Sequence, residues 1–294
     1  MKKRIFKGAG TAIITPFKEG KVDFEAYFKL IEFQISNGID AIIVCGTTGE
    51  ASTLTDDEHR KMIDITVEKV NGRTKIVAGT GSNDTDYSVE LSKYAAKAGV
   101  DGLLQVTPYY NKATQKGLVK HFFKVADAVD TPVILYNVPS RTNLNILPAT
   151  YKELSKHENI VATKEAGGDM GAVAQTMELC GDDLEFYSGN DGDIVPILSL
   201  GGIGVISTMA NIIPKETVGI CSLYFDGKTA ESAKEQIKYS SLIEALFCEV
   251  NPIPLKTAMC LMNLDSGELR LPLTDMEEKN KNKLAEIMKT HKLI

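Results

Sequence analysis

The segments TPVILYN (131–137) and NIVATK (159–164) are two short apolar runs, and each one ends at a side chain that can take part in chemistry. Continuous runs of this kind are typical of parallel strands that helices cover on both faces. Tyr136 closes the first run and Lys164 closes the second, one strand–helix unit later. A sheet built in chain order therefore places the tyrosine and the lysine on neighbouring strands, at the same edge.

The same alternation of short apolar runs and helical patterns continues along the chain. Apolar residues recur at helical spacing in two stretches, at Phe24, Phe28, Ile31 and Ile35 and at Leu118, Phe122, Val125 and Val129. Eight strands are expected, near residues 9–15, 40–45, 75–80, 101–106, 132–136, 159–164, 184–188 and 203–206. Eight strands in strand–helix order predict an α/β fold, a closed (β/α)8 TIM barrel.

Glycines support this interpretation at two helix ends and at one strand start. Gly38 and Gly99 each precede a strand and are expected to cap the helix before it. The cluster Gly201-Gly202-Ile203-Gly204 enters the eighth strand, which places it at the bottom of the barrel. Phosphate-binding glycines of such barrels follow strands seven and eight instead, so the cluster argues against a sugar-phosphate isomerase.

The strand pattern ends near residue 226. We therefore expect a catalytic barrel over residues 1–226 and a C-terminal helical extension over residues 227–294. The extension reads as about three helices, with breaks at Asn251-Pro252 and Leu271-Pro272. It carries no motif of its own, which favours a role in packing or assembly over an independent function.

The composition limits the classes of function. Hydrophobic residues make up 43% of the chain, the mean hydropathy is −0.08 and the formal charge is −6, without a basic stripe for nucleic acid. No apolar run approaches the ~20 residues of a membrane span, and the basic start of the chain is soon interrupted by glycine and Pro16, so a cytoplasmic protein is expected.

Cysteine and histidine usage gives no sign of a disulfide framework or a metal site. The 5 cysteines are an odd number without a CxxC pair, and the 4 histidines are dispersed. We expect reduced cysteines and no metal. Cys45, in an IIVC run, is a candidate nucleophile, but a small buried hydrophobe is the favoured interpretation.

Lys164 is the principal candidate for catalysis. The C-terminal ends of barrel strands form the active-site face, where partial burial disfavours the ammonium form of a lysine. Ala166, Gly167 and Gly168 follow it and leave space beside the amine. A neutral amine can condense with a ketone to an imine, which draws electrons from the neighbouring carbon more strongly than the ketone does.

The segment GTTGE (46–50) follows the second strand at the same face. Its hydroxyls and backbone N–H groups are expected to hold a carboxylate, helped by the N-terminus of the adjacent helix. The segment lacks the GK[ST] of a P-loop, so a nucleotide phosphate is not the expected ligand.

Five motifs follow one another along the chain, each at the end of an expected strand: GTTGE (46–50), TPYYN (107–111), YNVPSRT (136–142), TKEA (163–166) and YSGND (187–191). Together they resemble the dihydrodipicolinate synthase (4-hydroxy-tetrahydrodipicolinate synthase) family, within the pyruvate-dependent aldolases of the N-acetylneuraminate lyase superfamily. The resemblance covers essentially the whole chain. It implies a lyase that condenses pyruvate with aspartate 4-semialdehyde, the first committed step toward diaminopimelate and lysine, without cofactor or metal.

The resemblance also implies roles for particular residues. Lys164 matches the Schiff-base lysine, and Thr47 and Thr48 match the groups that hold the pyruvate carboxylate. Tyr136 matches the proton carrier, linked through Thr47 to Tyr110. A phenol shuttles protons at neutral pH only with such a relay.

Further positions follow from the same resemblance. Arg141 matches the arginine that receives the semialdehyde carboxylate, and Gly189 and Ile206 match positions that line the imine side. Gly189 and Ile206 also fit simply as a turn glycine and a strand aliphatic. In the family the counterpart of Tyr110 crosses a tight dimer interface, and two dimers make a homotetramer.

Two other functions stay open at this point. N-acetylneuraminate lyase and keto-deoxy-sugar aldolases use the same lysine and tyrosine, but a polyol substrate does not need Arg141. A barrel that only binds a keto acid is opposed by the complete set of Lys164, both tyrosines and Thr47.

Feedback inhibition by lysine is expected to be weak or absent. The effector pocket of sensitive relatives is matched at three positions, Asn83, Tyr109 and His59. Tyr87 stands where those relatives carry a glutamate for the effector's amine, and Ala51 replaces a serine. A buried ammonium without its carboxylate keeps its desolvation penalty. The open alternative is that Asp84 or Asp86 supplies the charge.

Overall fold

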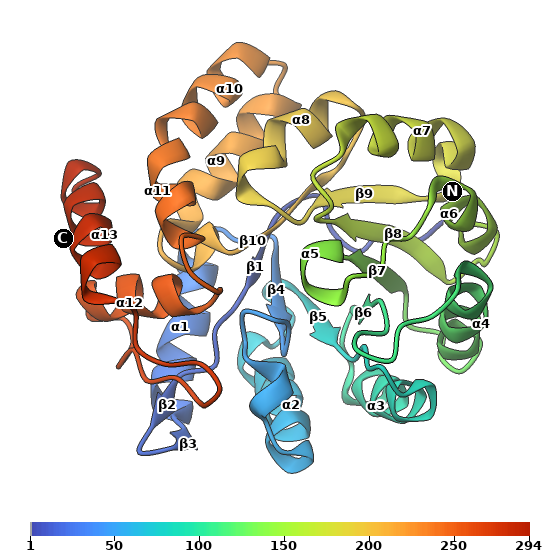
Figure 1. Cartoon of the computed structure of the whole chain (residues 1–294), viewed down its shortest axis with the longest axis horizontal. Helices are drawn as coiled ribbons and strands as arrows, with labels where there is room; N and C mark the ends of the chain where they lie inside the picture. Colours follow the sequence, from blue (N-terminus) through green and yellow to red (C-terminus); the bar gives the residue numbers. More distant parts are fainter. Residues whose placement is uncertain (1) are drawn as a thin grey trace.

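The computed structural model describes residues 2–294 and shows a closed barrel of parallel strands. The barrel order is β1-β10-β9-β8-β7-β6-β5-β4, so consecutive barrel strands are neighbours (Figure 1). The strands are β1 (Gly8–Ala12), β4 (Ala41–Val44), β5 (Lys75–Gly79), β6 (Gly102–Val106), β7 (Val133–Asn137), β8 (Ile160–Glu165), β9 (Glu185–Ser188) and β10 (Gly204–Ser207). Each overlaps its expected range, and the predicted TIM barrel is confirmed.

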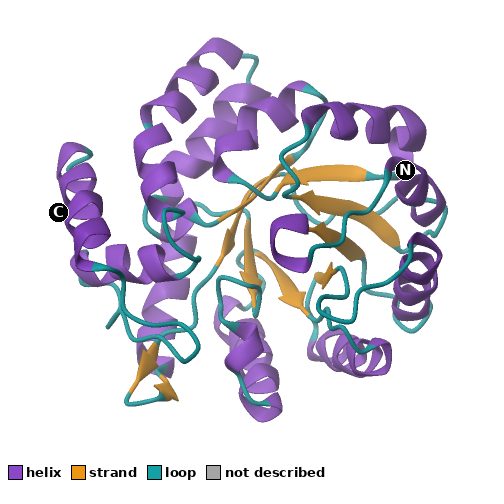
Figure 2. Cartoon of the chain, in the orientation of Figure 1, coloured by secondary structure: helices purple, strands orange, loops and turns teal. Residues whose placement is uncertain are grey.

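Helices surround the barrel on its outside (Figure 2). Up to the end of the last strand–helix unit they are α1 (Phe24–Ser36), α2 (Asp56–Val70), α3 (Thr85–Ala98), α4 (Gln115–Ala126), α6 (Pro148–Leu154), α7 (Met170–Cys180), α8 (Ile194–Ser199) and α9 (Pro214–Phe225). The short helix α5 (Pro139–Thr142) lies inside this ring, near the end of β7 (Figure 1). Across residues 2–294, none of the helices combines the length and the apolar character that a membrane crossing requires.

The continuous apolar runs have both faces buried. In β4, Ala41 and Ile43 belong to the apolar cluster inside the barrel, whereas Ile42 and Val44 belong to the larger cluster between strands and helices. Successive side chains of a strand point to opposite faces, so a strand buried on both sides must be apolar throughout. This explains why runs such as AIIV predict parallel strands.

The two expected glycine caps are present. Gly38 and Gly99 follow helices α1 and α3 with φ of 79° and 99°, left-handed values that glycine adopts without a Cβ clash. The buried face of α1 differs from the expected stripe, because Phe24 and Phe28 are only partly buried. The ammonium groups of Lys61 and Lys69 lie 4.3 and 4.6 Å from the centroids of these two rings.

Two further differences concern segment ends. Val129 lies beyond the end of α4, so it does not belong to that helix. A small antiparallel hairpin, β2 (Phe17–Lys18) and β3 (Lys21–Val22), stands outside the barrel and was not expected. Its two-residue strands are too short to give an apolar period.

Four helices follow the barrel, where about three were expected: α10 (Thr229–Lys238), α11 (Ser240–Leu246), α12 (Ile253–Leu261) and α13 (Glu278–Thr290). Only Tyr239 separates α10 from α11. The division at residue 226 stays a prediction, since α10 packs directly on α9. Figure 1 shows α12 and the loop after it beside the β2–β3 hairpin, where Glu268 accepts hydrogen bonds from Glu19 N (2.8 Å) and Gly20 N (2.6 Å).

Candidate active site

Lys164 and Tyr136 lie side by side at the mouth of the barrel. They are register partners on β8 and β7, and Lys164 Nζ lies 4.3 Å from the centroid of the Tyr136 ring. Lys164 is 6% exposed and Tyr136 is 7% exposed. Within residues 2–294 the Lys164 amine forms no hydrogen bond and has no carboxylate within 4 Å. An amine held in this way is available to attack a ligand.

The next residue on each strand points away from the mouth and forms a polar network. The Glu165 carboxylate accepts hydrogen bonds from Asn137 Nδ2 (3.0 and 3.1 Å), Tyr151 Oη (3.0 Å) and Gly167 N (2.7 Å). Burial raises the pKa of Glu165 above its ordinary value. The network joins the ends of β7 and β8 and so fixes the spacing of Tyr136 and Lys164. Sequence reasoning missed it, although a glutamate that closes an apolar strand was a signal.

The loop after β4 carries Thr47 and Thr48. Within the part of the chain that the structure describes, neither backbone N–H has a hydrogen-bond acceptor, while Thr48 Oγ1 accepts a hydrogen bond from Asn251 Nδ2 at 3.0 Å. The loop is bounded by two residues with left-handed backbone, Cys45 (φ 55°) and Glu50 (φ 51°). Such strain in non-glycine residues is concentrated at functional sites.

The α-helix that follows this loop begins some residues after it, so the contribution of a helix N-terminus stays a prediction. The loop leads into a short 3-10 turn, η1 (Ala51–Thr53), and α2 begins only at Asp56. The first turn of α2 is closed by a capping box, in which Thr55 Oγ1 accepts from Glu58 N and Glu58 Oε2 accepts from Thr55 N. Helix α2 therefore begins beyond the loop, and a carboxylate ligand at the loop would depend on the N–H groups of the two threonines.

A cavity of about 500 Å3 opens beside these residues, and Thr47, Tyr136 and Arg141 all line it. Lys164 is not in the lining and lies against the Tyr136 ring. Arg141 comes from the short helix α5 and is exposed, with one nitrogen donating to Asn251 O at 3.1 Å. The remaining N–H groups of its guanidinium are available for a carboxylate.

Gly189 and Ile206 lie on the other side of Lys164. Gly189 N donates to Glu165 O at 2.7 Å, and a Cβ at this position would lie 2.7 Å from the Cβ of Ala166, so the close approach of the β8 and β9 ends requires glycine. Ile206, on β10, is buried inside the barrel. Backbone packing explains the glycine at 189, and burial inside the barrel explains the isoleucine at 206. Contact of either residue with a ligand stays a prediction.

Asp191 is a further buried carboxylate near this side, and sequence reasoning did not single it out. It accepts hydrogen bonds from Ser207 Oγ (2.5 Å), Met209 N (2.8 Å) and Thr208 N (3.2 Å). Burial raises its pKa, and the Ser207 and backbone bonds and the nearby Lys164 charge oppose that change. It holds the loop after β10 against the loop after β9.

Tyr110 does not join the cavity within one chain. It is 92% exposed with a left-handed φ of 69°, an unusual backbone conformation for a bulky residue. It lines a separate surface groove with Asn83 and His121. The other positions named for the effector pocket, His59, Tyr87, Tyr109 and Ala51, line the same cavity as Tyr136.

Cys45 is buried and burial raises the pKa of its thiol. Its place in the apolar cluster between strands and helices agrees with the interpretation as a small buried hydrophobe. All 5 cysteines are free in the structure.

Known proteins resemble this chain along almost its whole length. The Dihydrodipicolinate synthetase family model matches residues 5–291. A 4-hydroxy-tetrahydrodipicolinate synthase of Acetivibrio thermocellus is 56% identical over 294 residues, 100% of both chains. The solved structure of dihydrodipicolinate synthase from Thermotoga maritima has a TM-score of 0.97 at 41% identity and covers 99% of this chain and 100% of that one. A monomeric dihydrodipicolinate synthase variant has a TM-score of 0.96 at 42% identity, with 99% and 98% covered.

Proposed function

Because this chain belongs to the dihydrodipicolinate synthetase family, we propose that it condenses pyruvate with aspartate 4-semialdehyde through an imine on Lys164. The chain is a lyase of amino-acid biosynthesis, and the reaction gives 4-hydroxy-tetrahydrodipicolinate, the first committed step toward diaminopimelate and lysine. One observation carries the proposal for the site: a buried amine, which has no hydrogen-bond partner among the described residues, lies 4.3 Å from the ring centroid of a tyrosine at the barrel mouth.

Lys164 supplies the covalent step. Its amine attacks the ketone carbon of pyruvate and water leaves, which gives the imine. A proton then leaves the methyl carbon, and the resulting enamine carbon attacks the aldehyde carbon of the second substrate. The amino group of that substrate finally attacks the imine carbon, closes the ring and displaces Lys164, so the enzyme is regenerated.

Thr47, Thr48 and Tyr136 surround the first substrate in this proposal. The free N–H groups of Thr47 and Thr48 receive the pyruvate carboxylate, a bond between a donor and a charged acceptor. Tyr136 carries protons to and from the reacting atoms, and Thr47 lines the same cavity as a relay partner. Gly189 and Ile206 border the imine on the opposite side.

Arg141 receives the carboxylate of aspartate 4-semialdehyde. Arg141 lines the same cavity as Thr47 and Tyr136, which fits a short substrate that carries a carboxylate at its far end. A planar guanidinium binds such a group through two parallel hydrogen bonds. A polyol chain has no group for this fork, which disfavours a sugar aldolase, and the 56% identical relative is a synthase.

The active form is a homotetramer, a dimer of dimers, that works in the cytoplasm. Tyr110 supports this part of the proposal, because a tyrosine that is 92% exposed on a strained loop is suited to contact a second copy. Across the tight dimer interface it would complete the relay of Tyr136 and Thr47. A monomeric variant among the similar structures shows that assembly needs its own test.

One assay tests the activity. Purified protein is given pyruvate with aspartate 4-semialdehyde in one reaction and pyruvate with N-acetylmannosamine in another, and product is measured in both. We expect turnover only with the semialdehyde. Turnover with the amino sugar alone would replace the proposal by an N-acetylneuraminate lyase, and turnover with neither would leave a barrel that only binds keto acids.

A further inference from the structure

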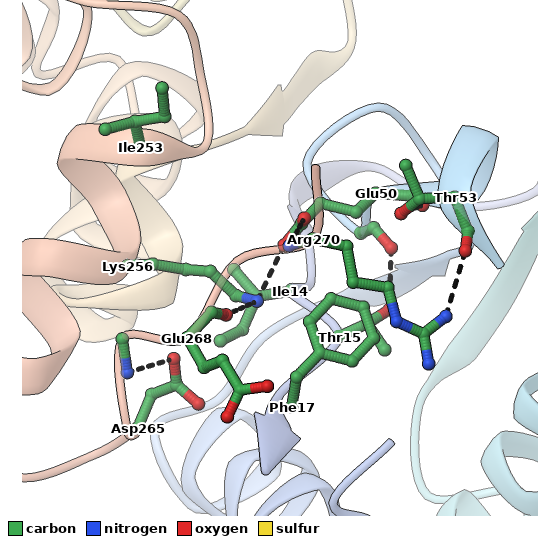
Figure 3. A network of polar contacts seen from close by, with 12 residues as sticks. Ile14, Thr15, Phe17, Glu50, Thr53, Ile253, Lys256, Asp265, Glu268 and Arg270 are labelled. Atoms are coloured by element: carbon green, nitrogen blue, oxygen red, sulfur yellow. Dashed lines mark hydrogen bonds and ion pairs between the residues drawn. The ribbon is translucent and has the colours of Figure 1, made fainter. Parts of the chain in front are cut away.

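A second lysine is buried outside the barrel mouth, in the C-terminal helices. Lys256 lies in the first turns of α12, and its side chain is 0% exposed. Its Nζ donates to Glu50 Oε1 at 2.6 Å and to Glu268 O at 2.7 Å, and it lies 4.2 Å from the centroid of the Phe17 ring (Figure 3). The ammonium is thus fully surrounded by partners from three separate segments.

Its partner Glu50 is the last residue of the GTTGE loop. The Glu50 side chain is 1% exposed, and its second oxygen accepts a hydrogen bond from Arg270 N at 3.2 Å. The residue has a left-handed backbone, with φ of 51°. A glutamate keeps this conformation only when its surroundings determine it, and here the C-terminal segment supplies both groups that hold the carboxylate.

Glu50 is linked by a backbone hydrogen bond to Thr47, one of the two threonines that are proposed to bind the substrate. Glu50 N donates to Thr47 O at 3.1 Å, and Gly49 N donates to Gly46 O at 3.1 Å, so the loop is a compact turn. Thr15 Oγ1 closes it from the other side by donating to Gly49 O at 2.7 Å. A shift of Glu50 therefore moves Thr47 and Thr48 and cannot be absorbed by slack in the loop.

The stability of the fold does not by itself require this pair. Two apolar side chains of similar volume often stabilise a protein as well as a buried ion pair, because removing two charges from water is costly. A buried pair instead fixes a position, since the two donors Lys256 Nζ and Arg270 N each hold one oxygen of the Glu50 carboxylate. The C-terminal extension reaches the site a second time through Asn251, which bonds to both Thr48 and Arg141.

We propose that Glu50 and Lys256 are positioning residues, which hold the GTTGE loop so that Thr47 and Thr48 receive the carboxylate of pyruvate. This inference rests on the proposed function of Lys164 and the two threonines. It gives the C-terminal segment a part in substrate binding, in addition to the packing or assembly role expected from its sequence.

The experiment measures how much pyruvate is needed for the imine to form. Wild-type protein and Lys256→Met are incubated with increasing pyruvate, reduced with borohydride, and the labelled fraction is followed by mass. We expect Lys256→Met to need about tenfold more pyruvate for half-labelling and to show a similar rise in the KM for pyruvate, with the KM for the semialdehyde changed by less than about threefold.

Glu58→Gln is the matched control. Glu58 forms a salt bridge with Arg270, at 2.6 Å, from the same C-terminal loop, but it lies on α2 and does not touch the GTTGE loop. Its loss should leave the pyruvate requirement unchanged. An equal rise in Glu58→Gln would show that any weakening of the C-terminal loop has this effect, and the specific role of the pair would be wrong.

The double variant Glu50→Gln/Lys256→Met separates positioning from stability, because it leaves no unpaired buried charge. We expect its unfolding temperature to lie closer to wild type than that of Lys256→Met, while its pyruvate requirement stays raised. Recovery of both properties would overturn the inference, and if Lys256→Met does not fold, the double variant decides alone.

The labelling experiment also distinguishes failure of the proposed function from failure of the positioning role. If wild-type protein is not labelled at all, the proposed function fails. If wild type and both variants are labelled alike, only the positioning role fails.

Discussion

Two buried lysines of this chain lie over aromatic rings in nearly the same way and have opposite surroundings. Lys164 lies 4.3 Å from the centroid of Tyr136 and Lys256 lies 4.2 Å from the centroid of Phe17. Lys256 has a carboxylate and a carbonyl oxygen as partners, whereas Lys164 has neither within residues 2–294. Both lysines are buried and lie over an aromatic ring, so the two sites differ in the hydrogen-bond partners of the amine.

This difference teaches how one side chain serves two purposes. Burial lowers the pKa of Lys256, and the Glu50 carboxylate at 2.6 Å opposes that change. The hydrogen bonds to Glu50 and Glu268 also engage the amine, so it is not available as a nucleophile. Within residues 2–294, Lys164 has no such partner, and the Tyr136 ring against which it lies lines a cavity that can admit a keto acid. We therefore assign covalent chemistry to Lys164 and positioning of the GTTGE loop to Lys256.

The largest effect is expected on turnover. Lys164→Ala removes the nucleophile, so kcat should fall by at least about a thousandfold, as happens when a covalent catalytic group is lost. Steady-state assays of the synthase reaction measure this. If Lys164→Ala retained more than about a tenth of the wild-type kcat, Lys164 would not be the covalent catalytic group.

The free energy of unfolding should depend more on Lys256 than on Lys164. Lys256→Met leaves Glu50 buried without its partner, which should lower the free energy of unfolding by about 3–5 kcal/mol. Lys164→Met removes an amine that has no partner in the described part of the chain and adds apolar contacts, so the free energy of unfolding should stay the same or rise. Urea unfolding of both variants decides the point, and equal losses would show that the two environments do not differ as described.

Arg141 sharpens the comparison by separating the two substrates. Arg141→Ala should reduce kcat/KM for the semialdehyde by about 10- to 150-fold, since a charge-assisted bond contributes about 1.5–3 kcal/mol. Imine formation between Lys164 and pyruvate should be unchanged. Arg73→Ala is the control, because Arg73 pairs with Glu32 on the outer surface. Equal losses in both steps would refute the proposed role of Arg141.

A smaller, partial effect is expected from subunit mixing. Lys164→Ala and Tyr110→Phe chains are each inactive or nearly so in this account, but a hybrid dimer contains one site with an intact Lys164 and an intact Tyr110. Mixing the two proteins should restore a fraction of wild-type activity. No recovery after demonstrated exchange of subunits would show that Tyr110 does not complete a neighbouring site.

The smallest expected effect is that of free lysine, whose amine would need a partner as Lys256 does. Both carboxylates that were left open for this purpose are engaged: Asp84 caps α3 by accepting from Asp86 N (2.9 Å) and Tyr87 N (3.4 Å), and Asp86 pairs with Lys124. Half-inhibition should therefore lie above about 1 mM. Tyr87→Glu should lower it, and strong inhibition of the wild type would overturn the claim.

The sequence allowed most of the barrel to be predicted, because the evidence for it is local. Apolar runs and the caps Gly38 and Gly99 depend on near neighbours in the chain, whereas the β2–β3 hairpin is too short for any period. Strand ends also brought Lys164, Tyr136, Thr47 and Arg141 to one face. The Glu50–Lys256 pair joins positions 206 residues apart, so no pattern reveals it in advance. A lysine inside the otherwise apolar IPLKTAMCL (253–261) was the only local signal.

The most direct test of the account compares the two lysines in one sample. Wild-type protein is treated with pyruvate and borohydride, digested, and the modified peptide is identified by mass spectrometry. The account predicts one reduced pyruvate on Lys164 and none on Lys256, because only the amine without a carboxylate partner is free to form the imine. Modification of Lys256 or another lysine in place of Lys164, or no modification at all, would contradict it.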